Sequence, residues 1–276
     1  MVKVTQYGRI KRFDLARTLV GRGRYWTTAY LVDGLMGDTG CAHCTPELLS
    51  ALAGTPLEQI ANTHSHEDHI GSNAPLQGQR PGLKIMAHPL ALPVLADPAG
   101  KQPLHLYRRL FWGLPAPSQG KPIYGGDRVQ TGHHQFEVIE TPGHAPDHLC
   151  LFEPENGWLF SGDLFVGGRD RALRAGCDIW GIIASLKKIA QLPITWLFPG
   201  SARVRQDPLP EIEEKISYLE ETGEKVMDLH RLGRSVDQIA RALFGGPMWV
   251  ERITLGHFSR RHLVRSYLEL EAGNQA

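Results

Sequence analysis

The chain has 276 residues, of which 42% are hydrophobic and 21% are charged. This length fits one large domain, or one domain with a small appendage, and the composition is typical of globular proteins rather than disordered or fibrous ones. The charges sum to 30 − 29 = +1, which argues against a general nucleic-acid binder, because such proteins are normally basic.

The sequence shows no apolar run of membrane-spanning length and no apolar core of a secretion signal near its start. Its four cysteines do not form a disulfide framework. We therefore expect a cytoplasmic protein with reduced thiols and no membrane partner.

The first predicted elements are strands. Residues 2–38 are rich in aromatic and β-branched side chains, with a hairpin turn predicted at Asp33-Gly34. A short helix is predicted within 41–54, with Thr45 as its N-cap.

Short strands and helices then alternate until residue 207. A segment rich in proline and aromatic residues, 101–122, is predicted to be a partly helical insertion. The predicted strands are 59–63, 83–88, two within 134–154, 157–163 and 195–201, and the predicted helices are 89–98 and 180–192.

The remainder of the chain is predicted to be helical. Charged and apolar residues recur there with helical spacing, and Ser235 is positioned as an N-cap. We predict an α/β domain at 1–207 and a C-terminal extension, all-helical or winged-helix-like, at 208–276. The predicted helices of this extension are 211–232, 235–245 and 259–270.

The segment THSHEDH at 63–69 is the strongest indication of chemistry. His64 and His66 are two positions apart, so at the end of an extended strand their side chains point the same way. Asp68 and His69 follow where the chain leaves the strand. Imidazole and carboxylate groups together are ligands that zinc and iron prefer, so the segment predicts a metal site.

Two later segments fit the same site. His144 follows a Pro-Gly turn in TPGHAPDH, from which a loop can reach a metal. Asp163 ends the apolar run GWLFSGD, where a carboxylate is uncommon unless it is paired or bound to a metal. His148 lies four residues after His144, and both a ligand- or substrate-bonding role and a packing role remain open.

Taken in order, GDTG, THSHEDH, TPGH and SGD resemble the motifs of the metallo-β-lactamase-fold hydrolases. The TPGHAPDHL loop, the insertion and the helical tail resemble the glyoxalase II branch of that family. The resemblance implies a four-layer αββα sandwich with one or two metal ions at its edge. It also implies a first metal held by His64, His66 and His144, a second held by Asp68, His69 and a bridging Asp163, and an Asp38 that orients the ligands.

One position departs from the family pattern. Related proteins carry PGH on the last strand, whereas this chain reads FPGSAR with Ser201 at that place. Because a hydroxyl is a poor zinc ligand, we expect a weak second site that accepts iron or manganese as readily as zinc. Ser201 is expected to lie near the ligands or the substrate.

The resemblance implies a zinc hydrolase in which Asp68 orients a metal-bound hydroxide and takes up its proton. A small thioester, ester or lactone is the expected substrate, and a homo-oligomer remains open. Arginines near the motifs suggest an anionic substrate, although a solvated charged loop is the alternative explanation for them. They are Arg169, Arg171, Arg174, Arg203 and Arg205.

Two other functions remain open from the sequence. A persulfide dioxygenase would hold a single iron through His64, His144 and Asp163, and a degenerate site would make the chain a non-catalytic metal-binding protein. The pair Cys41 and Cys44 has the spacing of a redox dithiol or of half a zinc site.

Overall fold

The computed structural model describes residues 1–19, 21–102 and 104–273. They group into two compact units, each formed from several stretches of chain. The first unit comprises Met1–Glu140, Pro146–Val166 and Pro193–Pro208, and the second comprises Thr141–Ala145, Gly167–Leu192 and the chain from Leu209 on. The division into domains at 1–207 and 208–276 stays a prediction.

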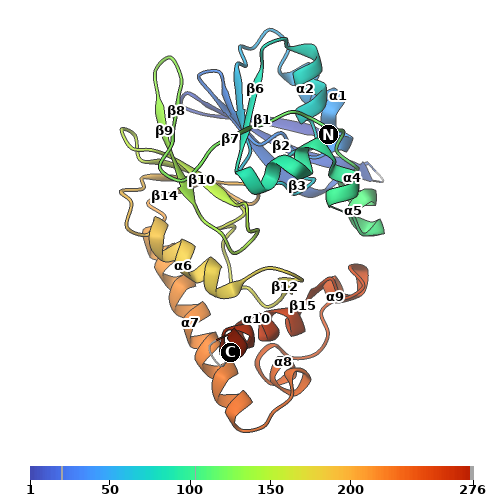
Figure 1. Ribbon diagram of the computed structural model, residues 1–276, viewed down its shortest axis with the longest axis vertical. Coiled ribbons are helices and arrows are strands. Elements are labelled where there is room, and N and C mark those ends of the chain that lie inside the picture. The colour runs from blue at the N-terminus through green and yellow to red at the C-terminus, as the bar shows by residue number, and fades with distance from the viewer. Residues whose placement is uncertain (20, 103, 274–276) are drawn as a thin grey trace. The chain divides into compact units, whose positions relative to one another are not determined.

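Two β-sheets form the body of the first unit (Figure 1). One sheet has seven strands in chain order: β1 (Val2–Tyr7), β2 (Ile10–Leu19), β3 (Arg22–Val32), β4 (Leu35–Gly37), β5 (Gln59–Ala61), β6 (Lys84–Ala87) and β7 (Lys121–Pro122). The other has the order β14 (Arg205–Gln206), β13 (Trp196–Pro199), β11 (Trp158–Gly162), β10 (Leu149–Glu153), β9 (Gln135–Glu140) and β8 (Arg128–Gln130).

The hairpin predicted between β3 and β4 is confirmed. Val32 pairs with Leu35, and the two residues between them, Asp33 and Gly34, have φ angles of 47° and 79°. A two-residue hairpin loop of this kind needs left-handed backbone at both positions, which Asp tolerates better than most residues and Gly adopts freely. The turn therefore brings β4 back along β3, and β4 then begins the parallel part of the sheet.

Aromatic and branched side chains fill the space between the two sheets. Phe160 of β11 stacks on Phe198 of β13 with ring centroids 5.0 Å apart, and Tyr30 of β3 packs edge-on against both rings. The buried Tyr30 hydroxyl donates a hydrogen bond of 2.7 Å to the Pro199 carbonyl oxygen. This contact joins the two sheets next to the point where β13 ends.

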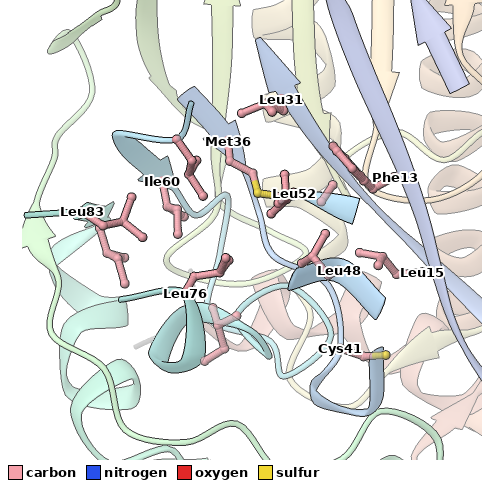
Figure 2. Packing of buried hydrophobic residues seen from close by; sticks show 14 of the residues in the cluster. Phe13, Leu15, Leu31, Met36, Cys41, Leu48, Leu52, Ile60, Leu76 and Leu83 are labelled. Atoms are coloured by element: carbon pink, nitrogen blue, oxygen red, sulfur yellow. The ribbon is translucent and has the colours of Figure 1, made fainter. Parts of the chain in front are cut away.

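Helices cover the other face of the seven-stranded sheet. Figure 2 shows Leu48, Leu52 and Leu76 packed with Met36 and Ile60 of the strands, all of them buried. Together with the two sheets, these helices form a layered α/β arrangement, and the predicted fold class is confirmed. The helices of this unit are η1 (Ala42–Cys44), α1 (Thr45–Ala51), α2 (Asn73–Gln79), η2 (Pro89–Ala91), α3 (Leu92–Ala96), α4 (Pro98–Lys101) and α5 (Leu106–Phe111).

The predicted N-cap of α1 is wrong. Thr45 is the first residue of the helix, and Cys44 occupies the cap position without a side-chain cap bond. The Thr45 hydroxyl instead lies 2.9 Å from the Ser72 hydroxyl and hydrogen-bonds with it. The side chain that was predicted to cap the helix is therefore engaged in a tertiary contact.

The second unit is mainly helical, and its predicted helices are confirmed. Ser235 forms the predicted cap and exchanges hydrogen bonds with Gln238. A short antiparallel pair of strands shows that the C-terminal part is not purely helical. No helix in the described ranges is long and apolar enough to cross a membrane. The elements are β12 (Leu173–Arg174), α6 (Ile179–Ile189), α7 (Leu209–Arg231), α8 (Val236–Phe244), α9 (Trp249–Ile253), β15 (Phe258–Ser259) and α10 (Arg260–Gly273).

Candidate metal site

The candidate site starts where two neighbouring strands end. The parallel strands β4 and β5 end at Gly37 and Ala61, so the segments that follow leave the same edge of the sheet. Asp38 comes directly after β4, with a φ of 59°, and its backbone N–H donates to the Ala61 carbonyl oxygen at 3.2 Å. This bond places the Asp38 side chain beside the THSHEDH segment.

Asp38 is buried and accepts three hydrogen bonds from that segment. Its Oδ1 accepts from the Thr63 backbone N–H, and its Oδ2 accepts from the Thr63 hydroxyl and from Nδ1 of His69, all at 2.8 Å. A carboxylate can only accept here, so the proton of the neutral His69 ring lies on Nδ1 and the lone pair lies on Nε2. A metal-ligating histidine is normally oriented in this way.

His69 directs Nε2 towards two acidic side chains. The distance from Nε2 is 3.5 Å to Oδ2 of Asp163 and 3.9 Å to Oδ2 of Asp68. Burial opposes a charge on the ring, but the carboxylates of Asp38, Asp163 and Asp68 outweigh it and raise the pKa of His69 well above its ordinary value. The surroundings therefore favour a positive charge at this point.

A metal cation can take the place of the second proton, which the charged His69 ring would carry on Nε2. One ligand atom each from His64, His69 and Asp163 lie within 4.8 Å of one another. The Nε2 atom of His69 is buried and has no hydrogen-bond partner in the part of the chain that the structure describes. Imidazole and carboxylate donors at such separations fit a divalent zinc, iron or manganese ion.

His64 and His66 are brought together as the sequence predicts. Nε2 of His64 lies 2.8 Å from Nδ1 of His66, and Nδ1 of His64 lies 3.0 Å from the Thr63 hydroxyl. Both rings are buried. Thr63 thus contacts both Asp38 and His64, and it links the carboxylate to one of the predicted ligands.

Asp163 is positioned by a bulge at the end of β11. Phe160 pairs with Phe198, but Gly162 rather than Ser161 pairs with Pro199. An extra residue of this kind bends a strand and redirects the side chains after it, and such bulges are common beside functional sites. The Asp163 backbone N–H then donates to Nε2 of the buried His148 at 3.2 Å.

Gly200 leaves the space that the ligands occupy. A Cβ atom at this position would lie 2.7 Å from Oδ1 of Asp163 and 2.8 Å from Cε1 of His69. The carbonyl oxygen of Gly200 accepts from the Thr28 backbone N–H at 2.7 Å, which fixes the backbone there. Ser201 follows and is half-buried.

An arginine that the sequence analysis missed reaches into the motif from the insertion. Arg108 on α5 donates a short hydrogen bond to Oε1 of Glu67, and its Nη2 lies 4.0 Å from Oδ1 of Asp68. Glu67 is fully buried and Arg108 is 5% exposed. No spacing in the sequence indicates this pair, because its members are 41 positions apart and Arg108 lies outside the motifs.

The TPGHAPDH loop is divided between the two units, with Thr141–Ala145 in the second and the residues from Pro146 on in the first. Asp147, which the sequence analysis did not assign, belongs to the first unit and accepts from the Ser65 backbone N–H at 2.9 Å. His144 belongs to the second unit, where its carbonyl oxygen accepts from the Cys177 thiol at 3.1 Å. Its assignment as a ligand stays a prediction.

The arginines near the motifs make contacts within the protein. Arg171 donates to the Phe244 carbonyl oxygen, Arg169 lies 3.7 Å from Glu214, and the buried Arg205 donates to the Arg203 carbonyl oxygen. These three side chains thus have contacts within the protein, and such contacts do not by themselves indicate an anionic substrate.

Comparison with known proteins agrees with this geometry. The family model of the metallo-beta-lactamase superfamily matches residues 27–201. A hydroxyacylglutathione hydrolase from Nitrosococcus oceani is 32% identical over 179 residues, which cover 61% of this chain and 59% of that protein. Another from Thermosynechococcus vestitus is 30% identical over 140 residues, covering 51% and 47%. The chain thus spans about half the length of the curated relatives it matches.

Two solved structures show the same fold. A metallo-beta-lactamase family protein from Thermus thermophilus aligns with a TM-score of 0.67 at 19% identity, covering 96% of this chain and 94% of that one. TTHA1623, solved in a di-iron-bound form, aligns with a TM-score of 0.55 at 32% identity, covering 71% and 96%. The expected metallo-β-lactamase fold is confirmed.

Proposed function

The chain belongs to the metallo-beta-lactamase superfamily, and on that premise we propose that it is a metal-dependent hydrolase of a small thioester. An ester or a lactone is the alternative substrate, because the same attack of water on a carbonyl carbon applies to it. The observation that carries the proposal is the cluster of His64, His69 and Asp163, whose ligand atoms lie within 4.8 Å of one another.

The proposed ligands fall into two sets. His64, His66 and His144 hold the first ion, and Asp68, His69 and Asp163 hold the second. Zinc is the proposed metal for the first set. The second set lacks the additional imidazole that Ser201 replaces, so we propose weaker binding there and tolerance of iron or manganese. The di-iron form of the 32%-identical TTHA1623 supports iron as an alternative.

A bound divalent ion supplies an activated water at neutral pH and polarises the carbonyl oxygen of the substrate. The protein's own part is to hold the ligands and to move the proton. Asp38 keeps the Nε2 lone pair of His69 available through its hydrogen bond to Nδ1. Asp68 accepts the proton that water releases and passes it to the leaving thiolate. Thioester and water thus yield a thiol and a carboxylic acid, which releases its proton to solvent at neutral pH.

The substrate class is supported by the relatives that the chain matches. Both relatives described above are named hydroxyacylglutathione hydrolases, so a thioester of a small hydroxy acid is the first substrate to test. A small-molecule substrate also agrees with the near-zero net charge of +1, which offers no general attraction for nucleic acid.

The test combines elemental analysis of protein purified without added metal with turnover of a panel of thioesters, esters and lactones. Bound zinc and thioester hydrolysis would support the proposal. A single equivalent of iron with oxygen uptake on a persulfide, and no hydrolysis, would replace it with the dioxygenase. A protein that takes up no metal in equilibrium dialysis would instead have a degenerate, non-catalytic site.

Asp68→Asn is expected to lower kcat about 100-fold or more, because positioned proton transfer contributes on this scale. The first metal should be retained, since Asp68 belongs to the second set. The measurement is kcat beside metal content for each protein. Asp97→Asn is the matched control, because Asp97 caps α4 and asparagine caps equally well. Equal losses of metal and turnover would limit Asp68 to holding metal.

Gly200→Ala is expected to reduce metal binding without unfolding the protein, because its Cβ would intrude on Asp163 and His69. We expect a loss of about tenfold or more in affinity, the scale on which misplaced ligand supports act. Titration against a chelator measures it. The control is Gly78→Ala in α2, where a Cβ meets nothing within 4 Å. Unchanged affinity in Gly200→Ala would show that these two side chains are not metal ligands.

A further inference from the structure

Two of the four cysteines lie in contact within one turn of chain. Cys41 immediately precedes the short helix η1 and Cys44 is its last residue, and the Cys41 thiol donates to the Cys44 sulfur across 3.3 Å. The Cys44 backbone N–H also donates to the Cys41 carbonyl oxygen at 3.0 Å, which closes the turn. Bond formation between the sulfurs therefore needs only a small local movement.

The other two cysteines are placed differently. The Cys150 thiol donates to the Ser161 carbonyl oxygen at 3.7 Å, and the Cys177 thiol donates to the His144 carbonyl oxygen at 3.1 Å. Neither bond is to another sulfur. The contact between two sulfurs is thus a specific feature of the turn at Cys41 and Cys44. Cys150 and Cys177 serve as internal controls for cysteines without such a contact.

We propose that Cys41 and Cys44 form a reversible thiol–disulfide site for small hydroperoxides, and that its oxidation weakens the metal site. Both thiols are fully buried, and Cys41 packs in the hydrophobic cluster of Figure 2. Burial favours a small oxidant such as hydrogen peroxide over a bulky disulfide such as that of glutathione.

The chemistry balances with one hydroperoxide per pair. The hydrogen bond from Cys41 lowers the pKa of Cys44, so Cys44 is the attacking sulfur. Its thiolate displaces hydroxide from hydrogen peroxide and becomes a sulfenic acid. The Cys41 thiol then displaces that oxygen as water, and the sulfur–sulfur bond forms. Two electrons leave the pair, and a thiol reductant returns them.

The turn is joined to the metal site through backbone contacts. The Gly40 carbonyl oxygen accepts from the Gly71 N–H at 2.8 Å, and the Thr39 N–H donates to the His69 carbonyl oxygen at 2.7 Å. The contact is tight, because a Cβ on Gly71 would lie 2.2 Å from the Ala42 backbone nitrogen. Asp38, which orients His69, precedes the turn by three residues.

A disulfide would pull this turn together. Bonded sulfurs lie about 2 Å apart, so the pair must close by roughly 1 Å from its present contact of 3.3 Å. A close-packed interior transmits such a shift to its neighbours. The expected consequence is a displaced Asp38 and a His69 that is less well oriented for metal, with about tenfold weaker zinc binding.

The experiment treats the purified protein with hydrogen peroxide and follows intact mass, alkylatable thiols and zinc affinity. The wild type should lose two hydrogen atoms, lose two alkylatable thiols, and bind zinc about tenfold more weakly. A thiol reductant should reverse all three changes. The variants Cys41→Ala and Cys44→Ala should form no internal disulfide, whereas Cys150→Ser and Cys177→Ser should behave as the wild type.

Each remaining outcome contradicts the proposal. Added oxygen without loss of hydrogen, or a disulfide that persists in Cys44→Ala, would show that the pair is not the site of oxidation. A disulfide that leaves zinc affinity unchanged would refute the coupling. The coupling rests on the proposed metal site, whereas the disulfide does not. A reduced protein that binds no zinc but still forms the bond would therefore refute the proposed function and the coupling, but not the disulfide site.

Discussion

Asp38→Asn is expected to weaken metal binding about 10- to 100-fold while leaving the protein folded. The carbonyl oxygen of asparagine can replace Oδ1 and accept from the Thr63 backbone N–H. Its amide group then replaces Oδ2, so a donor faces Nδ1 of His69 where an acceptor stood. The ring must move its proton to Nε2, and the lone pair needed by a metal is lost.

The measurement is zinc affinity by competition with a chelator, with circular dichroism to check folding. Asp33→Asn is the matched control, because Asp33 and Asp38 share left-handed backbone, with φ angles of 47° and 59°, but Asp33 lies in the β3–β4 hairpin. We expect the control to bind zinc as the wild type does. Wild-type affinity in Asp38→Asn would show that the tautomer of His69 does not govern metal binding.

Arg108→Met is expected to lower the free energy of unfolding by about 3–5 kcal/mol, because it leaves the fully buried Glu67 carboxylate without its ionic partner. The methionine retains much of the apolar stem of the arginine, so the charge is the main loss. Unfolding in urea, measured on metal-free protein, gives the value. The exposed Arg109 is the next residue of the same helix, and Arg109→Met should change stability by no more than about 0.5 kcal/mol.

The double variant Arg108→Met/Glu67→Gln separates charge from packing. Removing both charges should recover most of the lost stability, since the cost of the single change is an uncompensated buried charge. If the double variant is as unstable as Arg108→Met alone, the packing of the arginine stem supports the motif. If Arg108→Met is as stable as the Arg109 control, the contact with Glu67 carries no net stability.

The sequence predicted local features well where local chemistry determines them. The Asp33-Gly34 turn requires left-handed backbone, and the side chain of Ser235 satisfies the start of its own helix. Thr45 failed as a predicted cap because Ser72, which is 27 positions away, hydrogen-bonds with its hydroxyl. A contact at that separation leaves no mark on the local pattern.

At the candidate metal site, too, contacts between residues distant in the sequence could not be predicted. The spacing of THSHEDH and SGD predicts a cluster of donors, and the ligand atoms of His64, His69 and Asp163 do lie together. The residues that hold this cluster in place were only partly predictable. Asp38 belongs to the family pattern, but Arg108 lies in an insertion whose contact with Glu67 depends on how α5 packs. The clearance at Gly200 likewise depends on the approach of two separate segments.

The bulge in β11 restricts how the length of this chain can vary. Deletion of Ser161 would restore an unbroken ladder between β11 and β13. The same deletion would keep Gly162 opposite Pro199 but remove the bend of the bulge, so the carboxylate of Asp163 would no longer be directed as it is now. Insertions and deletions should therefore be tolerated in the exposed turn at 154–156 that precedes β11, but not between Phe160 and Asp163. In this strand the number of residues, as much as their identity, determines whether the carboxylate faces the histidines.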